Sequence, residues 1–290
     1  MESSAADDRR QSIEAGAERR AGVRLAPAHT SMCAEPRRIS QEGRGASRLD
    51  SGELHAFREH ALARGVNPLL YWIVRAVLLP FFLVYFRLER GGRERIPASG
   101  PVLLAANHRS FLDPFAIGAL TRRPVYYVAK RELFERRWQA WLLNSLGAFP
   151  IDRGAGDQDA MATARAILNR GDCVVIFPEG TRIRSGPLGD PHRGVGRLAL
   201  QTGARVVPVA VMGTEGVRRG WRVRPHKVRL RCGSPLSYPT VAEPSQAIAL
   251  GVAQRIWSSV SLQWEWLGGA TVDVGEQPSD EASVRETRAA

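Results

Sequence analysis

Apolar positions in the middle of the chain fall in blocks that predict strands and helices in alternation. Residues 102–106, 173–177 and 205–211 are apolar almost throughout, which is typical of strands covered on both faces. Residues 157–171 carry apolar side chains at helical spacing and begin at a good N-cap residue, Asp157. This alternation predicts an α/β fold in which helices cover a mixed, mostly parallel sheet.

Five further blocks extend the same pattern. Asp113 and Pro114 predict a helix start, with the aspartate as N-cap and the proline in the first turn. The predicted elements are a helix at 113–120, a strand at 125–130, an amphipathic helix at 133–147, a more exposed strand at 227–233 and a closing helix at 244–264.

The pattern disappears at both ends of the chain. Residues 1–60 contain few large apolar residues, and residues 267–290 are small, polar and acidic. Such segments bury too little apolar surface to offset the entropy of ordering. The sequence therefore predicts disordered tails at 1–60 and 267–290, a membrane-associated helical segment at 61–90 and a folded domain at 91–266.

Residues 69–86 are the most hydrophobic part of the chain, although Arg75 and Pro80 interrupt them. The uncharged run after Arg75 is shorter than the roughly twenty residues that span a bilayer. A spanning helix with a snorkelling Arg75, an interfacial or re-entrant helix, and a buried core helix all remain open. Interfacial aromatics and a following group of arginines favour the interfacial or re-entrant form, at the cytoplasmic face of the membrane. These residues are Tyr71, Trp72, Tyr85, Arg87, Arg90, Arg93 and Arg95.

The formal net charge of +12 is concentrated in the middle of the chain. Residues 1–60 hold ten arginines and ten acidic residues, and residues 267–290 hold two arginines and five acidic residues, a net −3, so the middle carries +15. This charge predicts an anionic partner, either a membrane surface or a phosphorylated substrate. Nucleic acid is not expected, because no zinc-type spacing or aromatic-flanked basic motif occurs. Three cysteines without a pattern argue against a disulfide framework.

Candidate catalytic residues follow the apolar run at 102–106. The stretch NHRSFLD places Asn107 and His108 at the end of this predicted strand and Asp113 five residues after the histidine. The carboxyl edge of an open α/β sheet is where ligands usually bind. A histidine and a carboxylate there resemble a general base and the group that orients it. Taken singly, a buried core histidine and a plain helix cap are the alternatives.

A second candidate site follows the strand at 173–177, in the stretch FPEGTR. Gly180 allows close approach of the backbone to a ligand, Thr181 offers a hydroxyl and Arg182 a planar guanidinium suited to phosphate. Arg153, in GAFPIDR, adds another arginine after a short apolar run. These residues predict a phosphate pocket, the alternative being a tight turn with solvated arginines.

Four of these blocks carry a family resemblance. In chain order, NHRSFLD, GAFPIDR, FPEGTR and VVPVAV resemble the NHxxxxD, GxxxxxR, FPEGTR and apolar proline blocks of the glycerolipid acyltransferases, over about residues 90–235. The resemblance implies that the domain at 91–266 is an acyltransferase domain. It also implies transfer of an acyl group from acyl-CoA or acyl carrier protein to the free hydroxyl of 1-acylglycerol 3-phosphate, giving phosphatidate.

The resemblance also implies residue roles. His108 would be the general base and Asp113 would hold its imidazole, while Glu179, Gly180, Thr181 and Arg182 would bind the glycerol phosphate with help from Arg153. No cofactor, metal or serine or cysteine nucleophile is implied. The membrane phospholipid surface, a lysophospholipid acceptor and the acyl donor are the expected partners.

The chain departs from the family pattern after FPEGTR. Ile183 stands where a serine is common, and Pro191, His192 and Arg193 stand where an aromatic residue and a lysine usually precede the glycine. A different lysophospholipid or a phosphorylated polyol lipid is therefore an alternative acceptor. A catalytically inactive, membrane-docked binding module and a thioesterase also remain open as functions. His192 is expected to be a loop residue rather than a second catalytic histidine.

Overall fold

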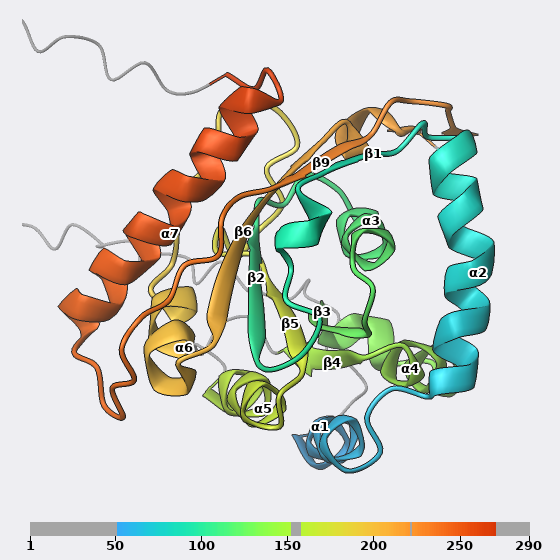
Figure 1. The fold of residues 1–290 in the computed structure, drawn as a ribbon. Helices are drawn as coiled ribbons and strands as arrows, with labels where there is room; N and C mark the ends of the chain where they lie inside the picture. Colours follow the sequence, from blue (N-terminus) through green and yellow to red (C-terminus); the bar gives the residue numbers. More distant parts are fainter. Residues whose placement is uncertain (1–50, 152–157, 221, 271–290) are drawn as a thin grey trace, which may run out of the picture. The chain divides into compact units, whose positions relative to one another are not determined.

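The computed structural model describes residues 51–151, 158–220 and 222–270 (Figure 1). Among them, a seven-stranded sheet has helices packed on both faces, and the predicted fold class is confirmed. The predictions for residues 1–50 and 271–290, for Asp157 as an N-cap and for Arg153 fall outside the described residues.

The sheet has the strand order β1-β9-β6-β2-β5-β3-β4. The five strands from β6 to β4 are parallel to one another, whereas β9 pairs antiparallel with β6, and β1 is parallel to β9. A separate antiparallel pair, β7 and β8, follows β6. The strands are β1 Glu89–Gly91, β2 Val102–Ala106, β3 Val125–Lys130, β4 Ala148–Ile151, β5 Cys173–Ile176, β6 Arg205–Met212, β7 Arg218–Arg219, β8 Arg222–Val223 and β9 Arg229–Cys232.

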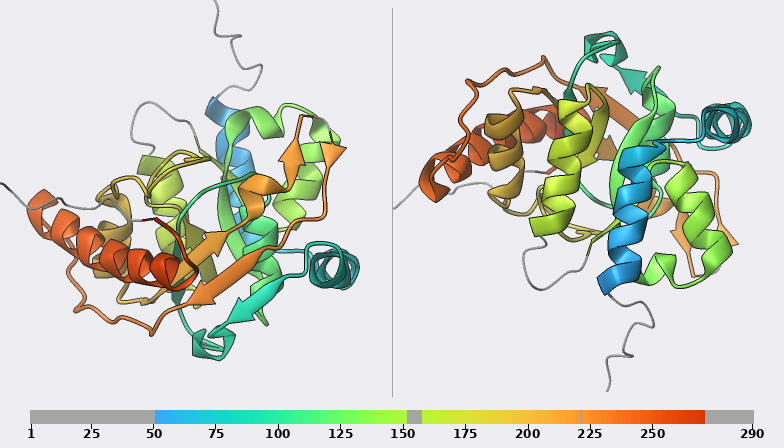
Figure 2. Two further views of the ribbon diagram at one scale, coloured as in Figure 1. Left: turned by 90° about the horizontal axis from the view of Figure 1, so that it is seen from above. Right: turned by 90° about the horizontal axis from the view of Figure 1, so that it is seen from below.

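Helices α2 and α3 pack on one face of the sheet, and α1, α5, α6 and α7 lie side by side on the other (Figure 2). Helix α4 packs beside β4 at the end of the sheet. The helices are α1 Ser51–Ala63, α2 Pro68–Val84, α3 Asp113–Leu120, α4 Arg137–Ser145, α5 Gln158–Asn169, α6 Gly194–Thr202 and α7 Gln246–Trp266, with short 3₁₀ turns η2 Arg93–Arg95, η3 Arg131–Phe134 and η4 Thr214–Gly216.

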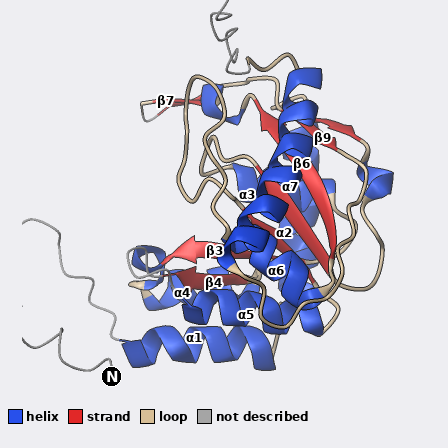
Figure 3. Ribbon diagram, turned by 90° about the vertical axis from the view of Figure 1, so that its left-hand side faces the viewer, coloured by secondary structure: helices blue, strands red, loops and turns tan. Residues whose placement is uncertain are grey.

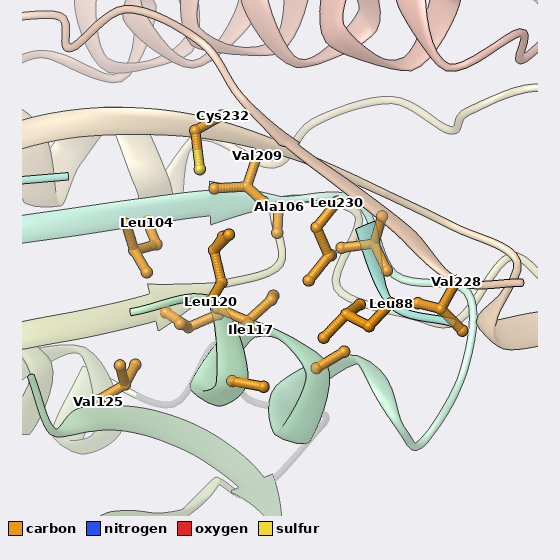
Figure 4. Close-up of a cluster of buried hydrophobic side chains, with 14 of the residues drawn as sticks. Leu88, Leu104, Ala106, Ile117, Leu120, Val125, Val209, Val228, Leu230 and Cys232 are labelled. Carbon is orange, nitrogen blue, oxygen red and sulfur yellow. The ribbon is translucent and has the colours of Figure 1, made fainter. Parts of the chain in front are cut away.

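The central strand β2 shows why its sequence is apolar throughout. Leu104 and Ala106 face the cluster under α3, where Ile117 and Leu120 pack (Figure 4). Leu103, beside Leu104 in the chain, faces the cluster under α5, α6 and α7. Successive side chains of a strand point to opposite faces, so a strand covered on both faces needs an apolar residue at every position.

Helix α1 corrects the prediction that residues 51–60 belong to a disordered tail. Its Phe57 ring lies 5.4 Å from that of Phe134, and the buried Arg58 side chain donates a hydrogen bond to the carbonyl of Pro150. Ala61 is fully buried. The segment has few large apolar residues, and it is held by contacts with distant parts of the chain that its own composition does not reveal.

The start of α3 differs from prediction by one residue. Asp113 is the first residue of the helix, and the N-cap position belongs to Leu112, whose side chain makes no capping hydrogen bond. The Asp113 carboxylate instead turns back to the preceding loop. Pro114 occupies the first turn, as predicted.

Helix α2 contains the apolar stretch, and Arg75 points into the protein from it. The Arg75 guanidinium donates to the carbonyls of Gly118 and Thr121 at the end of α3, where a cation also complements the helix dipole. Tyr71 and Phe82 are buried, but the outer side of the helix is not, which argues against a buried core helix. Its exposed side chains are Leu69, Trp72, Ile73, Val77, Phe81, Leu83 and Val84.

No helix in the described ranges is by itself long and apolar enough to cross a membrane. The bent pair His55–Ala63 and Pro68–Val84, which meet at 93°, passes that test of length and composition only when taken together. The membrane association of this segment therefore stays a prediction.

Candidate active site

The candidate site lies where three neighbouring parallel strands end. Strand β2 lies between β5 and β6, so the residues that follow these strands emerge at one edge of the sheet. They are Asn107 and His108 after β2, Phe177 to Glu179 after β5, and Gly213 and Thr214 after β6. This is the carboxyl edge, where the sequence predicts both candidate sites.

His108 and Asp113 form the predicted pair. The Nδ1 atom of His108 lies 2.8 Å from Oδ2 of the fully buried Asp113. The carboxylate accepts hydrogen bonds from every side: Oδ2 also accepts from the amides of Arg109 at 2.6 Å and Ser110 at 2.8 Å, and Oδ1 accepts from Thr214 Oγ1 at 2.5 Å. Asp113 is thereby fixed in one orientation, independently of the histidine.

This geometry assigns the tautomer of His108. Asp113 Oδ2 already accepts from two backbone amides, so Nδ1 of the imidazole donates to it, and in the neutral ring this tautomer leaves Nε2 as the acceptor. Nε2 has no hydrogen-bond partner among the described residues. The ring is stacked on Phe177, with centroids 4.1 Å apart, which limits its rotation. An imidazole held in this way is suited to accept a proton from a hydroxyl.

Asn107 joins β2 to β6 beyond their last paired residues. Its Nδ2 donates to the carbonyl of Val211 at 2.9 Å, and its Oδ1 accepts from the Val211 amide at 2.7 Å. The side chain thus continues the sheet ladder where the backbone of β2 turns away, and it fixes the base of the loop that carries His108.

Glu179 ties the two candidate sites together. Its Oε2 accepts from the His108 amide at 2.6 Å, and its Oε1 accepts from the Gly189 amide at 3.0 Å. Burial raises the pKa of the Glu179 carboxyl, while the hydrogen bonds from these amides act against that rise. Both oxygens of Glu179 are therefore engaged by the backbone, and direct contact of this residue with an acceptor stays a prediction.

Gly180, Thr181 and Arg182 form the turn after Glu179. Gly180 has φ +64°, and a Cβ there would lie 2.8 Å from the ring of His192, so both conformation and space favour glycine. Thr181 is exposed and Arg182 half-buried. Within the described ranges the Arg182 guanidinium has no hydrogen-bond or ion-pair partner. His192 lies in a loop, as predicted, and its amide donates to Pro178.

Arg109, which no sequence pattern singled out, anchors the loop after this turn. Only 2% of Arg109 is exposed, and its guanidinium donates to the carbonyls of Ile183 at 2.9 Å and Gly186 at 2.8 Å. It also lies 4.3 Å from the ring centre of Trp264 in α7, a cation–π distance. The neighbouring carbonyl of His108 accepts from the Ile183 amide. The loop is thus attached directly to the residues beside the base.

Replacing Arg109 by methionine should loosen the loop at 183–186. We expect the free energy of unfolding to fall by about 2 kcal/mol, since hydrogen bonds to a buried cation are lost, and trypsin to cleave faster after Arg184. Chemical denaturation and timed proteolysis measure the two effects. The exposed Arg165 in α5 provides the control, because Arg165→Met should change neither. A cleavage rate unchanged by Arg109→Met would contradict the anchoring role.

A small, mostly apolar cavity of about 50 Å³ lies between α2, α3 and β3. It is lined by Tyr71, Val74, Arg75, Leu78, Leu79, Pro114, Phe115, Gly118, Ala119, Val125, Tyr127 and Leu146.

Neither described cysteine is suited to nucleophilic chemistry. Cys173 and Cys232 are buried and unpaired, and burial raises the pKa of each thiol to about 12, so little thiolate forms near neutral pH. Among the described residues, no three His, Cys, Asp or Glu side chains are grouped so as to hold a metal ion.

The fold and site define an α/β protein with a histidine–aspartate pair at the carboxyl edge of a mostly parallel sheet. The acyltransferase family matches residues 87–212 of this chain. A 1-acyl-sn-glycerol-3-phosphate acyltransferase of Bacillus subtilis is 31% identical over 154 residues, which cover 51% of this chain and 75% of that protein. The chain belongs to the glycerolipid acyltransferase family, as its four sequence blocks indicated.

Two further comparisons define the extent of the similarity. A chloroplastic 1-acyl-sn-glycerol-3-phosphate acyltransferase of Arabidopsis thaliana is 31% identical over 133 residues, 45% of this chain, and the match spans only 37% of the plant protein. The crystal structure of the 1-acyl-sn-glycerophosphate acyltransferase of Thermotoga maritima aligns with a TM-score of 0.54 at 20% identity, covering 75% of this chain and 96% of that one. The similarity to the Thermotoga maritima structure concerns the fold alone.

Proposed function

We propose that this protein is an O-acyltransferase that acylates the free hydroxyl of 1-acylglycerol 3-phosphate, with acyl-CoA or acyl carrier protein as donor, and so forms phosphatidate. One observation carries the proposal: the imidazole of His108 is held by Asp113 at 2.8 Å and lies beside the turn that bears Arg182. Its other nitrogen, Nε2, has no hydrogen-bond partner among the described residues. The names of the relatives support the same reaction.

The chemistry needs one base and no covalent enzyme intermediate. Nε2 of His108 takes the proton of the acceptor hydroxyl as its oxygen forms a bond to the thioester carbonyl carbon. The resulting tetrahedral species breaks its carbon–sulfur bond, and the departing thiolate takes the proton back from the imidazolium. Asp113 stabilises that imidazolium and keeps the ring oriented.

The acceptor phosphate is expected at the turn after β5. The guanidinium of Arg182 suits a phosphate group, and the Thr181 hydroxyl and the backbone at Gly180 lie beside it. Arg153 is proposed to assist.

The membrane supplies the acceptor in this proposal. The exposed apolar side of α2 suits an interfacial or re-entrant position at the cytoplasmic face of the cell membrane. Arg75 makes its hydrogen bonds with α3 on the inner side of that helix, so the outer side meets lipid without a buried charge.

The test is product identification with a labelled acyl-CoA and a mixed pool of lysolipid acceptors. With lysophosphatidate we expect phosphatidate as the product. Arg182→Ala should raise KM for this acceptor about tenfold and leave kcat nearly unchanged, because one charge-assisted hydrogen bond to the phosphate is lost. Arg184→Ala, which removes an exposed arginine two residues on, should act as wild type. Equal effects of the two substitutions would contradict the role of Arg182, and release of free fatty acid without any acceptor would indicate a thioesterase.

A different phosphorylated acceptor is the second candidate. The observation that favours it is the packing of His192 against Gly180, at a position where the chain departs from the family pattern. A product formed from another lysophospholipid or a polyol phosphate lipid, in preference to phosphatidate, would establish it. The absence of turnover with every acceptor would favour an inactive, membrane-docked binding module.

A further inference from the structure

Exposed apolar side chains stand on the loops at the carboxyl edge of the sheet. Phe111 follows β2, Leu133 follows β3, Trp138 is in the first turn of α4, and Val223 is in β8, which follows β6; their exposed fractions are 43%, 42%, 64% and 50%. Since β2, β3 and β6 are parallel, the loops leave the same edge. The arrowheads of β3 and β4 point to the side on which β7 lies (Figure 3).

The same edge is strongly basic around β7 and β8. The stretch from residue 216 to residue 227, GVRRGWRVRPHK, contains arginines and a lysine and no acidic residue. Arg218 and Arg224 are exposed, and the Arg218 guanidinium lies 5.9 Å from the ring centre of Phe111. Arginines mixed with exposed aromatic and aliphatic side chains are suited to the headgroup region of a bilayer.

This surface adjoins the C-terminal end of α2. Tyr85, the C-cap residue of α2, donates from its hydroxyl to the carbonyl of Val223 at 3.2 Å. At the other end of the helix, the Asn67 amide donates to the carbonyl of Ser145, the last residue of α4. The C-terminal end of α2 therefore meets the carboxyl edge at β8, whereas its N-terminal end lies at the opposite edge of the sheet.

We propose that a carboxyl-edge rim, made of Phe111, Leu133, Trp138, Arg218, Val223 and Arg224, docks on the surface of an anionic phospholipid bilayer. Docking through this rim, in addition to α2, places the sheet edge that bears His108 against the lipid that holds the acceptor. The benefit of docking to the enzyme rests on the proposed function, but docking itself can be measured without turnover. An acidic protein surface would complement the charge of the arginines but would leave the four apolar side chains exposed to water. A bilayer accommodates both, so the rim favours lipid.

Vesicle binding of the full-length chain tests the charged part of the rim. In Arg218→Ser/Arg224→Ser, we expect partitioning to vesicles of mixed phosphatidylcholine and phosphatidylglycerol to fall about 25-fold at low salt, roughly fivefold for each arginine. Binding to pure phosphatidylcholine vesicles should barely change. Arg165→Ser/Arg255→Ser makes the same change of charge on α5 and α7 and should lower binding far less. Equal losses in the two pairs would overturn the proposal.

A second pair tests the apolar part. Trp138→Ser/Val223→Ser should weaken binding to both kinds of vesicle, and the tryptophan emission shift on binding should shrink. The control Ile248→Ser/Trp266→Ser removes side chains that are as exposed, at 55% and 68%, from α7, and should leave both measurements unchanged. Unchanged binding of the first pair would overturn the proposal.

The outcomes separate the rim from the reaction. If the arginine pair binds vesicles as wild type but loses affinity for acyl carrier protein, the rim is a donor-docking surface and the lipid proposal is wrong. If rim variants lose vesicle binding while the wild type forms no acylated product, the proposed function alone fails. If the wild type acylates lipid but the rim variants bind vesicles normally, the rim alone fails.

Discussion

Replacing His108 by alanine should lower the rate of phosphatidate formation about a thousandfold. The lost general base is worth roughly two to four orders of magnitude, and the residues around it offer no substitute, since Asp113 is fully buried behind the ring. The fold should survive, because the hydrogen bonds from the His108 amide to Glu179 and from the Ile183 amide to the His108 carbonyl belong to the backbone. A labelled acyl-CoA assay at saturating acceptor measures the effect.

His192 provides the matched control for this substitution. It is packed on Gly180, and its amide rather than its ring makes its hydrogen bond to Pro178. His192→Ala should therefore change the rate only severalfold, through acceptor binding. An unchanged rate in His108→Ala, or an equal loss in both variants, would rule out the assigned base.

The parts of the fold that the sequence predicted well are those fixed by local pattern. Strands β2, β5 and β6 lie between helical layers, so each position needs an apolar side chain, and their boundaries differ from prediction by at most one residue. The pair of His108 and Asp113 was also predictable from local sequence, because a short loop between a strand end and a helix start brings the two residues together. Local chemistry at one sheet edge was enough to find it.

Other features depend on contacts between distant parts of the chain. The stacking of Arg109 on Trp264 and the hydrogen bond from Thr214 to Asp113 join segments that no spacing rule relates. Helix α1 was missed because its own composition is weak and its stability comes from packing on α4, α5 and β4. The sequence predicted Asp113 as an N-cap residue. Its carboxylate instead accepts hydrogen bonds from the amides of Arg109 and Ser110 in the preceding loop.

Asp113→Asn should lower the acylation rate about a hundredfold with little loss of stability. Asp113→Ala should lower both the acylation rate and the free energy of unfolding. Three N–H donors, from His108, Arg109 and Ser110, converge on Oδ2, so asparagine must place its carbonyl oxygen there. Its amide group then faces Thr214, whose hydroxyl can turn to accept. The histidine keeps its tautomer and loses only the adjacent negative charge, which stabilises the imidazolium that forms during transfer.

In Asp113→Ala the same buried donors lose their acceptor, at about 1 to 3 kcal/mol for each. We therefore expect its free energy of unfolding to fall by roughly 3 to 5 kcal/mol, which chemical denaturation measures, with Asp113→Asn within about 1 kcal/mol of wild type.

A double substitution decides whether Asp113 acts through His108. If its charge serves only to stabilise the imidazolium, then once His108 has become alanine there is no imidazolium to stabilise, and adding Asp113→Asn should cost almost nothing more. The rates of His108→Ala and of His108→Ala/Asp113→Asn should therefore agree within about threefold, although Asp113→Asn alone costs about a hundredfold. A further large loss in the double variant would mean that Asp113 also contributes by shaping the loop at Arg109 and Ser110, a role that a positioned negative charge alone does not explain.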